Sequence, residues 1–600
     1  MRKNTQIFVC LFLLAFVFSG RAQTVVINEI MTSNTTVNTD EDGTYQDWVE
    51  LYNNSAAAVN LNGYGLTDDA TLPFKWVFPA VTMAPGSHLL VYCSDKNRTV
   101  VGQPLHTNWK ISSGGEVITL TSAASVTVDS YPATVIPQNM SFGHSPNGTG
   151  PLLFFPTPTP GTANTTQAYS EILPAPTFSQ EGGFYTAGFN LSISTNVAGA
   201  TIYYTLDGSE PSATNLGGTT YQYKNVYAEM PGDASGPMLT QSYQSMTYTA
   251  PISIVDRSPL PNKIANISTT YHHDPTYLPT SPLFKGTVVR ARVVKPGTLS
   301  SPIVTKTYFI TPSGSAEFAL PVISLSLNED RFFDYEDGIQ VAGIDFDTWR
   351  AANPSEEPTW QEVGNFYRRG SANEKIGNFT YFVGGEQVVN QDVGIRTRGG
   401  NSCAFQQKAM NIYARAELGG AKLNYKFFSD LTDNSFSRIM LRNGGGDFYG
   451  TMFRDELNQT TVAGLNETES YQPAVVFLNG EYWGILNIRE KYDNDYFKRV
   501  IGNDDIDFLE DEGIYETNIE EGDNLDFIDM NNYINNNSLV PDANYAYIQT
   551  RMDVNSFMDY QISNIYLDNA DWPGTNQHYW RTRNPFNPTA SYGNDGRWRW

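Results

Sequence analysis

The chain has 600 residues, of which 40% are hydrophobic and 17% are charged, and its formal net charge is −25. The hydrophobic content excludes a wholly disordered polyelectrolyte, and the excess of acids argues against counterion-driven binding of duplex DNA, so we expect no nucleic-acid partner. At roughly 150 residues per domain, the length predicts about four domains. Abundant Gly, Pro, Tyr and Phe favour β-rich modules joined by turn-rich loops.

Residues 1–22 have the pattern of a secretory signal peptide. A basic start at Arg2 and Lys3 precedes an apolar run over 7–18, and small residues follow. The run is shorter than the roughly 20 residues that span a bilayer, which favours cleavage and export over a membrane anchor. We therefore expect a secreted or cell-surface protein without a transmembrane segment.

The cysteines exclude a disulfide scaffold. Cys10 lies in the predicted signal peptide, so only Cys93 and Cys403 remain, and they fall in different predicted domains. Two thiols build neither a disulfide framework nor a cysteine-based structural zinc site. The modules must therefore be held together by their hydrophobic cores.

Residues 23–165 form the first predicted module. Short runs at 25–30, 48–52 and 88–92 alternate apolar and polar residues, and clusters of Asn, Gly and Pro separate them. Period-two runs with such breaks indicate an antiparallel sandwich or barrel.

Four motifs in this module resemble the lamin-tail domain, an immunoglobulin-like sandwich. They are Ile27-Asn28-Glu29-Ile30, Asp47-Trp48-Val49-Glu50-Leu51-Tyr52-Asn53, Leu61-Asn62-Gly63-Tyr64-Gly65-Leu66-Thr67-Asp68 and Pro158-Thr159-Pro160-Gly161-Thr162-Ala163-Asn164. The acids Glu29 and Glu50 leave two interpretations open, a metal site or hydrogen-bonded structural carboxylates. We favour the second.

Residues 172–312 form a second predicted β-module. A strand-like run at 200–206 enters the turn Asp207-Gly208, and further runs follow at 288–293 and 300–304. The pattern resembles the small β-sandwich at the C-terminus of chitobiases and hexosaminidases, with an irregular insertion across about 215–285. In that family the catalytic carboxylates lie in a separate barrel, so the resemblance implies a spacer or a module that contacts cell-surface carbohydrate, not a glycosidase.

Residues 318–600 mix strands with helices. Apolar residues recur at helical spacing in 452–460 and 554–562. Strand-like runs at 474–478 and 482–488 flank Asn479-Gly480, a strong hairpin signal. The class therefore changes to α+β, and chemistry is expected in this part of the chain.

Two stretches of this third domain carry residues suited to phosphate chemistry. The strand 394–398 runs into a glycine turn at Gly399, and Lys408 follows nine residues later. Turn amides approach phosphate closely and a lysine adds a point charge, although an ordinary hairpin fits the same pattern. Glu490 fits either a partner that orients Lys408 or a surface ion pair.

The second stretch is a loop that holds Asp571 and Asn576, five residues apart across a Pro-Gly bend. One loop can therefore aim both side chains at a common point. This is the spacing of a phosphotransfer loop, in which the Asp orients or deprotonates the acceptor hydroxyl and the Asn holds Mg²⁺.

These pieces, in this order, resemble the CotH family of spore-coat and secreted protein kinases. The resemblance implies an atypical kinase-like fold that uses ATP with Mg²⁺ or Mn²⁺ and phosphorylates Ser or Thr of a partner protein. The motifs that carry it are 394–399 with Lys408, Leu441-Arg442-Asn443, Phe453-Arg454-Asp455, 479–484 with Glu490, and 568–576. The implied roles are phosphate binding by Arg398, Gly399 and Lys408, orientation of Lys408 by Glu490, catalysis by Asp571 with Lys408 and Glu490, and metal binding by Asn576.

The sequence departs from the family pattern in one important place. Kinase-like sites carry a second metal-binding Asp shortly after the catalytic loop, but here Asp595 lies in Asn594-Asp595-Gly596, a hairpin signal. Two explanations stay open: the chain continues past Trp600, which we favour, or the domain is a pseudokinase.

A stretch of twelve acids without Lys or Arg covers 504–529. A solvated acidic face is the favoured interpretation, and a Ca²⁺ site or a docking surface for a basic substrate stays open.

The sequence thus predicts two N-terminal all-β, immunoglobulin-like sandwich modules followed by an α+β atypical kinase-like domain. The predicted function is a secreted protein kinase, and the alternative is a non-catalytic surface or adhesion protein that carries a pseudokinase domain.

Overall fold

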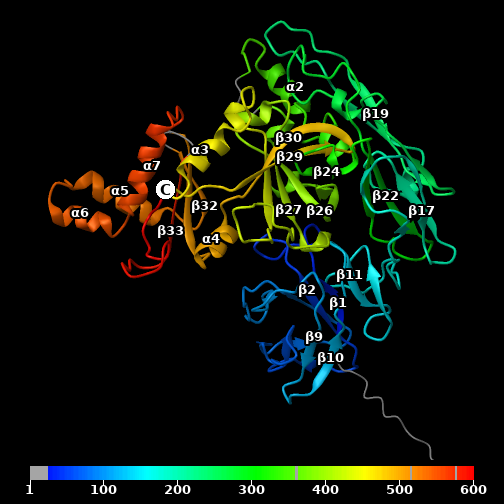
Figure 1. Cartoon of the computed structure of the whole chain (residues 1–600). Coiled ribbons are helices and arrows are strands. Elements are labelled where there is room, and N and C mark those ends of the chain that lie inside the picture. The colour runs from blue at the N-terminus through cyan, green and yellow to red at the C-terminus, as the bar shows by residue number, and fades with distance from the viewer. Residues whose placement is uncertain (1–24, 359–362, 514–515, 574–576) are drawn as a thin grey trace, which may run out of the picture. The chain divides into compact units, whose positions relative to one another are not determined.

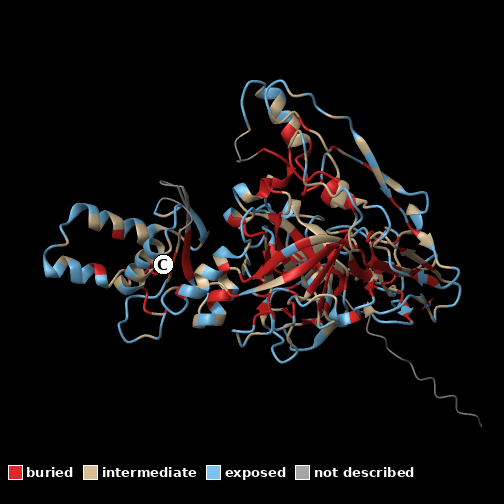
Figure 2. Cartoon of the chain, turned by 45° about the horizontal axis from the view of Figure 1, so that its top comes forward, coloured by how far each residue is buried: buried red, intermediate tan, exposed pale blue. Residues whose placement is uncertain are grey.

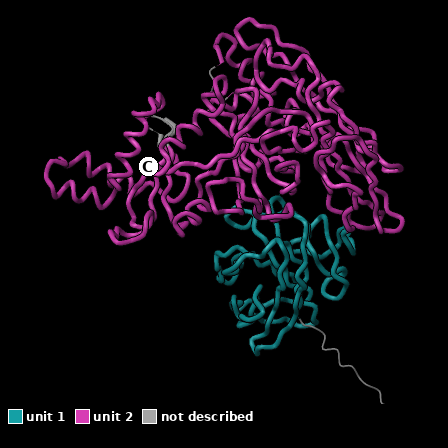
Figure 3. Tube along the Cα trace, in the orientation of Figure 1, with its two compact units in different colours: residues 1–172 teal, residues 173–600 magenta. Residues whose placement is uncertain are grey.

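The computed structural model describes residues 25–358, 363–513, 516–573 and 577–600. They fall into two compact units, divided between Ile172 and Leu173 (Figure 3). The predicted signal peptide, 1–22, lies outside the described residues. The predicted second and third domains both fall within the second unit.

The first unit contains two main sheets. Its strands are β1 (Val25–Met31), β2 (Trp48–Asn53), β3 (Val59–Asn60), β4 (Gly65–Thr67), β5 (Trp76–Val77), β6 (Thr82–Met83), β7 (His88–Tyr92), β8 (Leu105–His106), β9 (Ile118–Thr121), β10 (Thr127–Tyr131), β11 (Ser141–His144) and β12 (Leu152–Phe155). The larger sheet has the order β12-β11-β1-β2-β7-β8 and the smaller one β10-β9-β4-β5. β1 is buried along its whole length, so both of its faces lie in the interior.

Glu29 and Glu50 face each other across the β1–β2 ladder, and both are fully buried. Glu50 accepts hydrogen bonds from the Asn28 side chain (3.0 Å) and the Gly161 amide (2.6 Å), and Glu29 accepts two from Thr159 (2.9 and 3.1 Å). The two carboxyl groups therefore hold the 158–164 loop against the sheet, a structural role. Burial raises the pKa of Glu50 to about 8.

The second unit begins with small sheets. Its first strands are β13 (Thr177–Phe178), β14 (Gly183–Tyr185), β15 (Phe189–Leu191), β16 (Ile193–Ser194), β17 (Thr201–Thr205), β18 (Thr219–Tyr223), β19 (Leu239–Tyr243), β20 (Met246–Thr247), β21 (Ile252–Ile254), β22 (Thr287–Val294) and β23 (Val304–Ile310). Five of them form a sheet in the order β14-β23-β22-β17-β20, and β18 pairs with β19 inside the predicted insertion.

A closed barrel follows. Its strands are β24 (Val322–Ser326), β25 (Lys375–Val383), β26 (Glu386–Arg398), β27 (Ala409–Ala414), β28 (Arg438–Arg442), β29 (Tyr471–Leu478) and β30 (Glu481–Arg489). The predicted hairpin at Asn479-Gly480 is confirmed, since both residues have positive φ between β29 and β30, as a tight two-residue turn requires. Buried residues concentrate in these strands and fill the barrel (Figures 1 and 2).

The predicted insertion, which separates β17 from β22 within the small-sheet module, packs onto the barrel. Backbone amides of Lys263 and Ala265 donate to the Glu481 carboxylate (2.7 and 2.9 Å). Phe309 of β23 joins a shared apolar cluster with Phe382 and Phe477 of the barrel. The second unit is therefore continuous from the small sheets into the barrel.

Helices are few, and the described chain is mostly β. They are α1 (Asp330–Phe333), α2 (Gly343–Ala352), α3 (Arg454–Val462), α4 (Asn494–Ile501), α5 (Leu525–Asn536), α6 (Asp542–Gln549) and α7 (Val554–Tyr566). A sheet ordered β32-β31-β33 accompanies them, formed by β31 (Ile506–Gly513), β32 (Glu516–Glu521) and β33 (Gln577–Thr582). Among the described helices, none is both long and apolar enough to cross a membrane.

The buried Glu50 predicts how stability depends on pH. Its folded pKa of about 8 lies above the ordinary value of 4.5, so folding takes up a proton between these values. Stability is then fully present below about pH 4.5 and falls as pH rises toward 8, by up to about 1.4 kcal/mol per pH unit. Glu50→Gln, a mimic of the protonated form, should weaken this dependence and raise the first unit's thermal midpoint at pH 8, measured by calorimetry.

Glu171→Gln, at an exposed position of the same unit, is the matched control and should change neither value. An equal loss of stability in Glu50→Gln at pH 5 and pH 8 would show that Glu50 is ionised in the folded protein.

Candidate functional site

Strand alternation places two arginines on the outer face of the barrel. Arg398 ends β26 and pairs with Ala409 of β27, and Arg442 ends the next strand, β28. Met410 of β27 pairs with Leu441 of β28, and both side chains belong to the barrel's apolar core. Because side chains alternate along a strand, the adjacent residues Ala409 and Arg442 face outward. Only Ala409 separates the two arginines along this row.

A third arginine, Arg489 at the end of β30, holds α3 against this face. Its fully buried guanidinium contacts Asp455 (3.0 Å) and Glu456 (3.1 Å) of α3, and Glu469 (3.2 Å). Burial alone would lower the pKa of Arg489, but Glu469, Asp455 and Glu456 outweigh it and raise that pKa. Asp455 also contacts Nε of Arg442 (3.3 Å), which joins the second arginine to the network.

Arg398 differs from its neighbours because its guanidinium forms no hydrogen bond or ion pair with any residue that the structure describes. The side chain is partly buried, and burial lowers its pKa, with Glu469 and Glu510 acting in the opposite direction. Those two acids are engaged elsewhere, Glu469 with Arg489 and Glu510 with His578 (2.9 Å). A partly desolvated cation without a direct partner is costly, so the site favours an anion.

The predicted catalytic loop is linked to the surroundings of Arg398 through the strand that follows it, β33. It follows α7, and β33 begins after it at Gln577. His578 of β33 pairs with Glu510 of β31, the acid whose charge acts on Arg398. Asp571 is exposed on the loop, and its amide donates to the Asn569 side chain (3.1 Å). Asn576, the predicted metal ligand, lies outside the described residues.

Lys408 lies on the opposite face of the sheet from Arg398. It directly precedes Ala409, so alternation turns it away from the outer face, and it is completely buried beside Phe366, which belongs to a cluster separate from the barrel core. Its amino group donates to the carbonyls of Thr269 (2.7 Å), Cys403 (2.7 Å) and Phe405 (2.9 Å). All three of its donors are thereby used, and burial lowers its pKa to about 7. Its phosphate contact stays a prediction.

Glu490 and Lys408 are not brought together. The Glu490 carboxylate pairs with Arg499 of α4 and accepts a bond from the Ser470 amide (3.2 Å). Burial raises the pKa of Glu490, although Arg499 acts in the opposite direction. Glu490 also lines a cleft of about 210 Å³ together with Arg438, Lys491 and Arg499. Lys408 is not among the residues that line this cleft.

Asp595 is committed to ion pairs. Its carboxylate contacts Arg597 and Arg599, each at 2.7 Å, and it is buried. Burial would raise its pKa, but the two arginines outweigh it and lower the pKa to about 2. These contacts give Asp595 a structural role at the end of the described chain.

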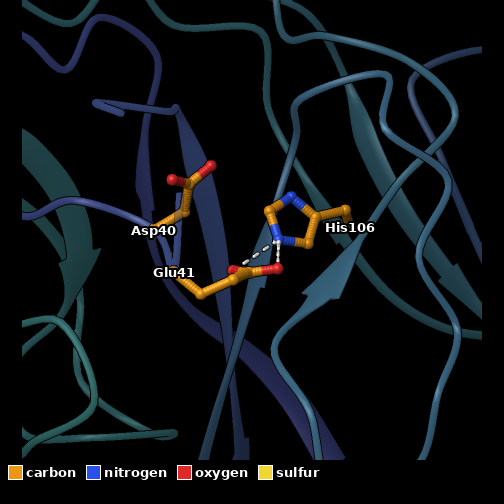
Figure 4. Close-up of side chains that lie close together, drawn as sticks. All are labelled: Asp40, Glu41 and His106. Atoms are coloured by element: carbon orange, nitrogen blue, oxygen red, sulfur yellow. Dashed lines mark hydrogen bonds and ion pairs between the residues drawn. The ribbon is translucent and has the colours of Figure 1, made fainter. Parts of the chain in front are cut away.

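The first unit contains a cluster of metal-ligating residue types, Asp40, Glu41 and His106 (Figure 4). Lys96 already contacts the Asp40 carboxylate, and Arg98 contacts Glu41. The His106 ring forms hydrogen bonds with the Glu41 carboxylate through Nε2 (3.0 Å) and with the Ser94 hydroxyl through Nδ1 (2.7 Å). The side chains of Lys96 and Arg98 thus offset the charges of Asp40 and Glu41, and these contacts join the 40–41 segment to the 96–98 segment.

The sequence analysis assigned no role to four residues of the barrel network, Arg442, Arg489, Glu456 and Glu469. A usable signal was present for two of them. Arg489 directly follows the strand-like run 482–488, and Glu456 lies in the helical run 452–460. A charged side chain at a position that the apolar periodicity predicts to be buried requires a partner of opposite charge. Here the two residues are partners of each other, although they lie far apart in the chain.

Three segments match known family models. Residues 19–134 match Lamin Tail Domain, residues 191–308 match Fn3 associated, and residues 395–600 match CotH kinase protein. A search of curated proteins finds no match. The order of the three matches confirms the predicted arrangement, in which a CotH-like segment follows a lamin-tail segment and a second β-module. The CotH match begins at Ile395, three residues before Arg398.

The contacts of Lys408 give a test of its role. Lys408→Met leaves three buried carbonyls without a donor, so we expect the free energy of unfolding to fall by roughly 1–3 kcal/mol. The loss should be the same with and without ATP and Mg²⁺, as measured by thermal denaturation. Lys422→Met, which removes a more exposed cation, is the control. An unchanged midpoint combined with a lost ATP-dependent shift would instead identify Lys408 as a phosphate ligand.

Proposed function

We propose that this protein is a secreted atypical protein kinase that transfers the ATP γ-phosphate to Ser or Thr of an extracellular or surface protein. The CotH kinase match over 395–600 supports the family assignment of this segment. The observation that carries the proposal is Arg398, whose guanidinium has no direct partner among the described residues. Its pKa is influenced by Glu510, which pairs with His578 of β33, the strand that follows the Asp571 loop. The kinase-like α+β fold is part of this proposal.

The residues fit the groups that the reaction needs. Arg398 offers guanidinium donors in a geometry suited to phosphate oxygens. Asn576, the predicted metal ligand, has a side-chain oxygen of the kind that Mg²⁺ takes. When bound, Mg²⁺ or Mn²⁺ offsets the charge of the nucleotide phosphates.

The chain's own contribution to transfer is positioning and proton acceptance. Arg398 holds phosphate oxygens on the barrel's outer face. The Asp571 carboxylate orients the acceptor hydroxyl and takes its proton as the oxygen attacks. Arg489 keeps α3, and through Asp455 also Arg442, fixed against the same face.

The sequence supports secretion and an extracellular protein partner as parts of this proposal. The signal-peptide pattern at 1–22 supports export, and an exported kinase meets extracellular acceptor proteins. The two N-terminal segments would then place the kinase segment at a surface. No contact in the structure points to carbohydrate as a ligand of the second β-module.

A transfer assay tests the proposal. Purified protein with γ-labelled ATP and Mg²⁺ or Mn²⁺ should label itself or an added Ser/Thr-containing protein. Asp571→Asn should lower incorporation by about 10²-fold or more, the contribution typical of a general base. Asp568→Asn makes the same change three residues earlier in the loop, and because Asn tolerates the positive φ found there, it should retain activity.

Equal incorporation by Asp571→Asn and wild type would remove Asp571 from the mechanism. No incorporation and no ATP-dependent thermal shift in the wild type would favour the second candidate function, a non-catalytic surface or adhesion protein with a pseudokinase domain.

A further inference from the structure

A glycine turn lies next to Arg442. β28 ends at Arg442, and the chain continues as Asn443, Gly444, Gly445, Gly446 and Asp447. Gly444 and Gly445 have φ of +85° and +55°, a region that side chains other than glycine rarely adopt. A Cβ on Gly445 would lie 3.2 Å from the Arg442 guanidinium, whereas a Cβ on Gly446 would meet nothing within 4 Å. The turn therefore lies against Arg442 on one side and is open on the other.

Asn443 fixes this turn to the loop that follows Arg398. The side chain is buried, its amide donates to the carbonyls of Gln407 (2.6 Å) and Ser402 (3.3 Å), and its oxygen accepts from the Gly445 amide (3.2 Å). Phe405 stacks on Phe448 at the far end of the two loops. The loops after β26 and β28 are thus one rigid element that carries both arginines.

Charge on this element is unbalanced. Nε of Arg442 contacts Asp455, which also contacts Arg489. The Arg398 side chain forms no hydrogen bond or ion pair in the described part of the chain. The two acids whose charge acts on Arg398 each contact another residue, Glu469 contacting Arg489 and Glu510 contacting His578. Two guanidinium groups beside an open glycine turn match the donors that bind a phosphate chain.

We propose that Arg398, Arg442 and the 444–446 turn together form the phosphate-binding site, and that the ligand is a polyphosphate anion of the kind that a nucleotide carries. This inference rests on the proposed function. It adds two parts to the site, Arg442 and the 444–446 turn, to which the family motifs assigned no role. The lysine expected to contact phosphate, Lys408, is on the opposite face.

Calorimetric titration of the whole protein with inorganic tripolyphosphate, ATP and adenosine tests the site. The wild type should bind tripolyphosphate and ATP but not adenosine. Arg398→Met and Arg442→Met should each weaken both interactions at least tenfold. Lys498→Met, which removes a mostly exposed cation of α4, is the matched control and should bind as the wild type does.

Stability in the absence of ligand separates binding from a structural role. Because no described residue contacts the Arg398 guanidinium directly, Arg398→Met should leave the thermal midpoint unchanged or raise it while anion binding is lost. Arg442→Met also breaks the contact with Asp455, so Arg442→Lys, which keeps the charge but not the planar fork, is the second variant and should bind more weakly than wild type.

The inference is overturned if the wild type fails to bind tripolyphosphate, or if Arg398→Met and both Arg442 variants bind it with unchanged affinity. Unchanged ATP affinity in these variants alongside ATP-dependent labelling would overturn this site and leave the kinase proposal standing. Binding of tripolyphosphate that the variants lose, without phosphate transfer by the wild type, would support the site and refute the kinase proposal.

Discussion

The alternation of side chains across the β26–β27–β28 ladder decides which groups can act together in this protein. Lys408 directly precedes Ala409, and that step turns the lysine away from the face on which Arg398 and Arg442 lie. A closed barrel has no free edge at which a strand can slip, so this register is fixed by the whole core. The proposed site therefore consists of arginines on the outer face, whereas the buried lysine joins the inserted segment to the barrel through the Thr269 carbonyl.

The buried ion pairs of Arg489 connect the outer face of the barrel to α3. Removing one partner from a buried, satisfied ion pair typically costs about 3–5 kcal/mol, because the remaining charge stays in the interior. Arg489 engages two acids of α3 and one that follows it, so α3 cannot leave the barrel without exposing or orphaning several charges. The network fixes Arg442 through Asp455, whereas Arg398 is left without such a contact. Arg489 is therefore structural, Arg442 is fixed at one nitrogen by Asp455, and Arg398 is the arginine that the described residues leave without a direct contact.

Much of the fold was predictable because it depends on local pattern. The Asn479-Gly480 hairpin and the helices at 454–462 and 554–566 follow from turn chemistry and apolar spacing. The site was predictable only in part. Arg398 and Gly399 stand at the end of a strand as the motif indicates, but the partners of Lys408 and Glu490 come from Thr269 and Arg499, which no short-range pattern connects to them. Whether a strand residue faces in or out depends on register, and register is a property of the completed barrel.

The central claim is that the two loops after β26 and β28 grip the phosphates of ATP. Hydrogen–deuterium exchange of the whole protein, with and without a non-hydrolysable ATP analogue and Mg²⁺, tests it directly. The account predicts slower exchange at 399–403 and 443–447 when the analogue is bound, with no change in β1 and β2 of the first unit. Nucleotide-dependent protection elsewhere, with both loops unaffected, would contradict it.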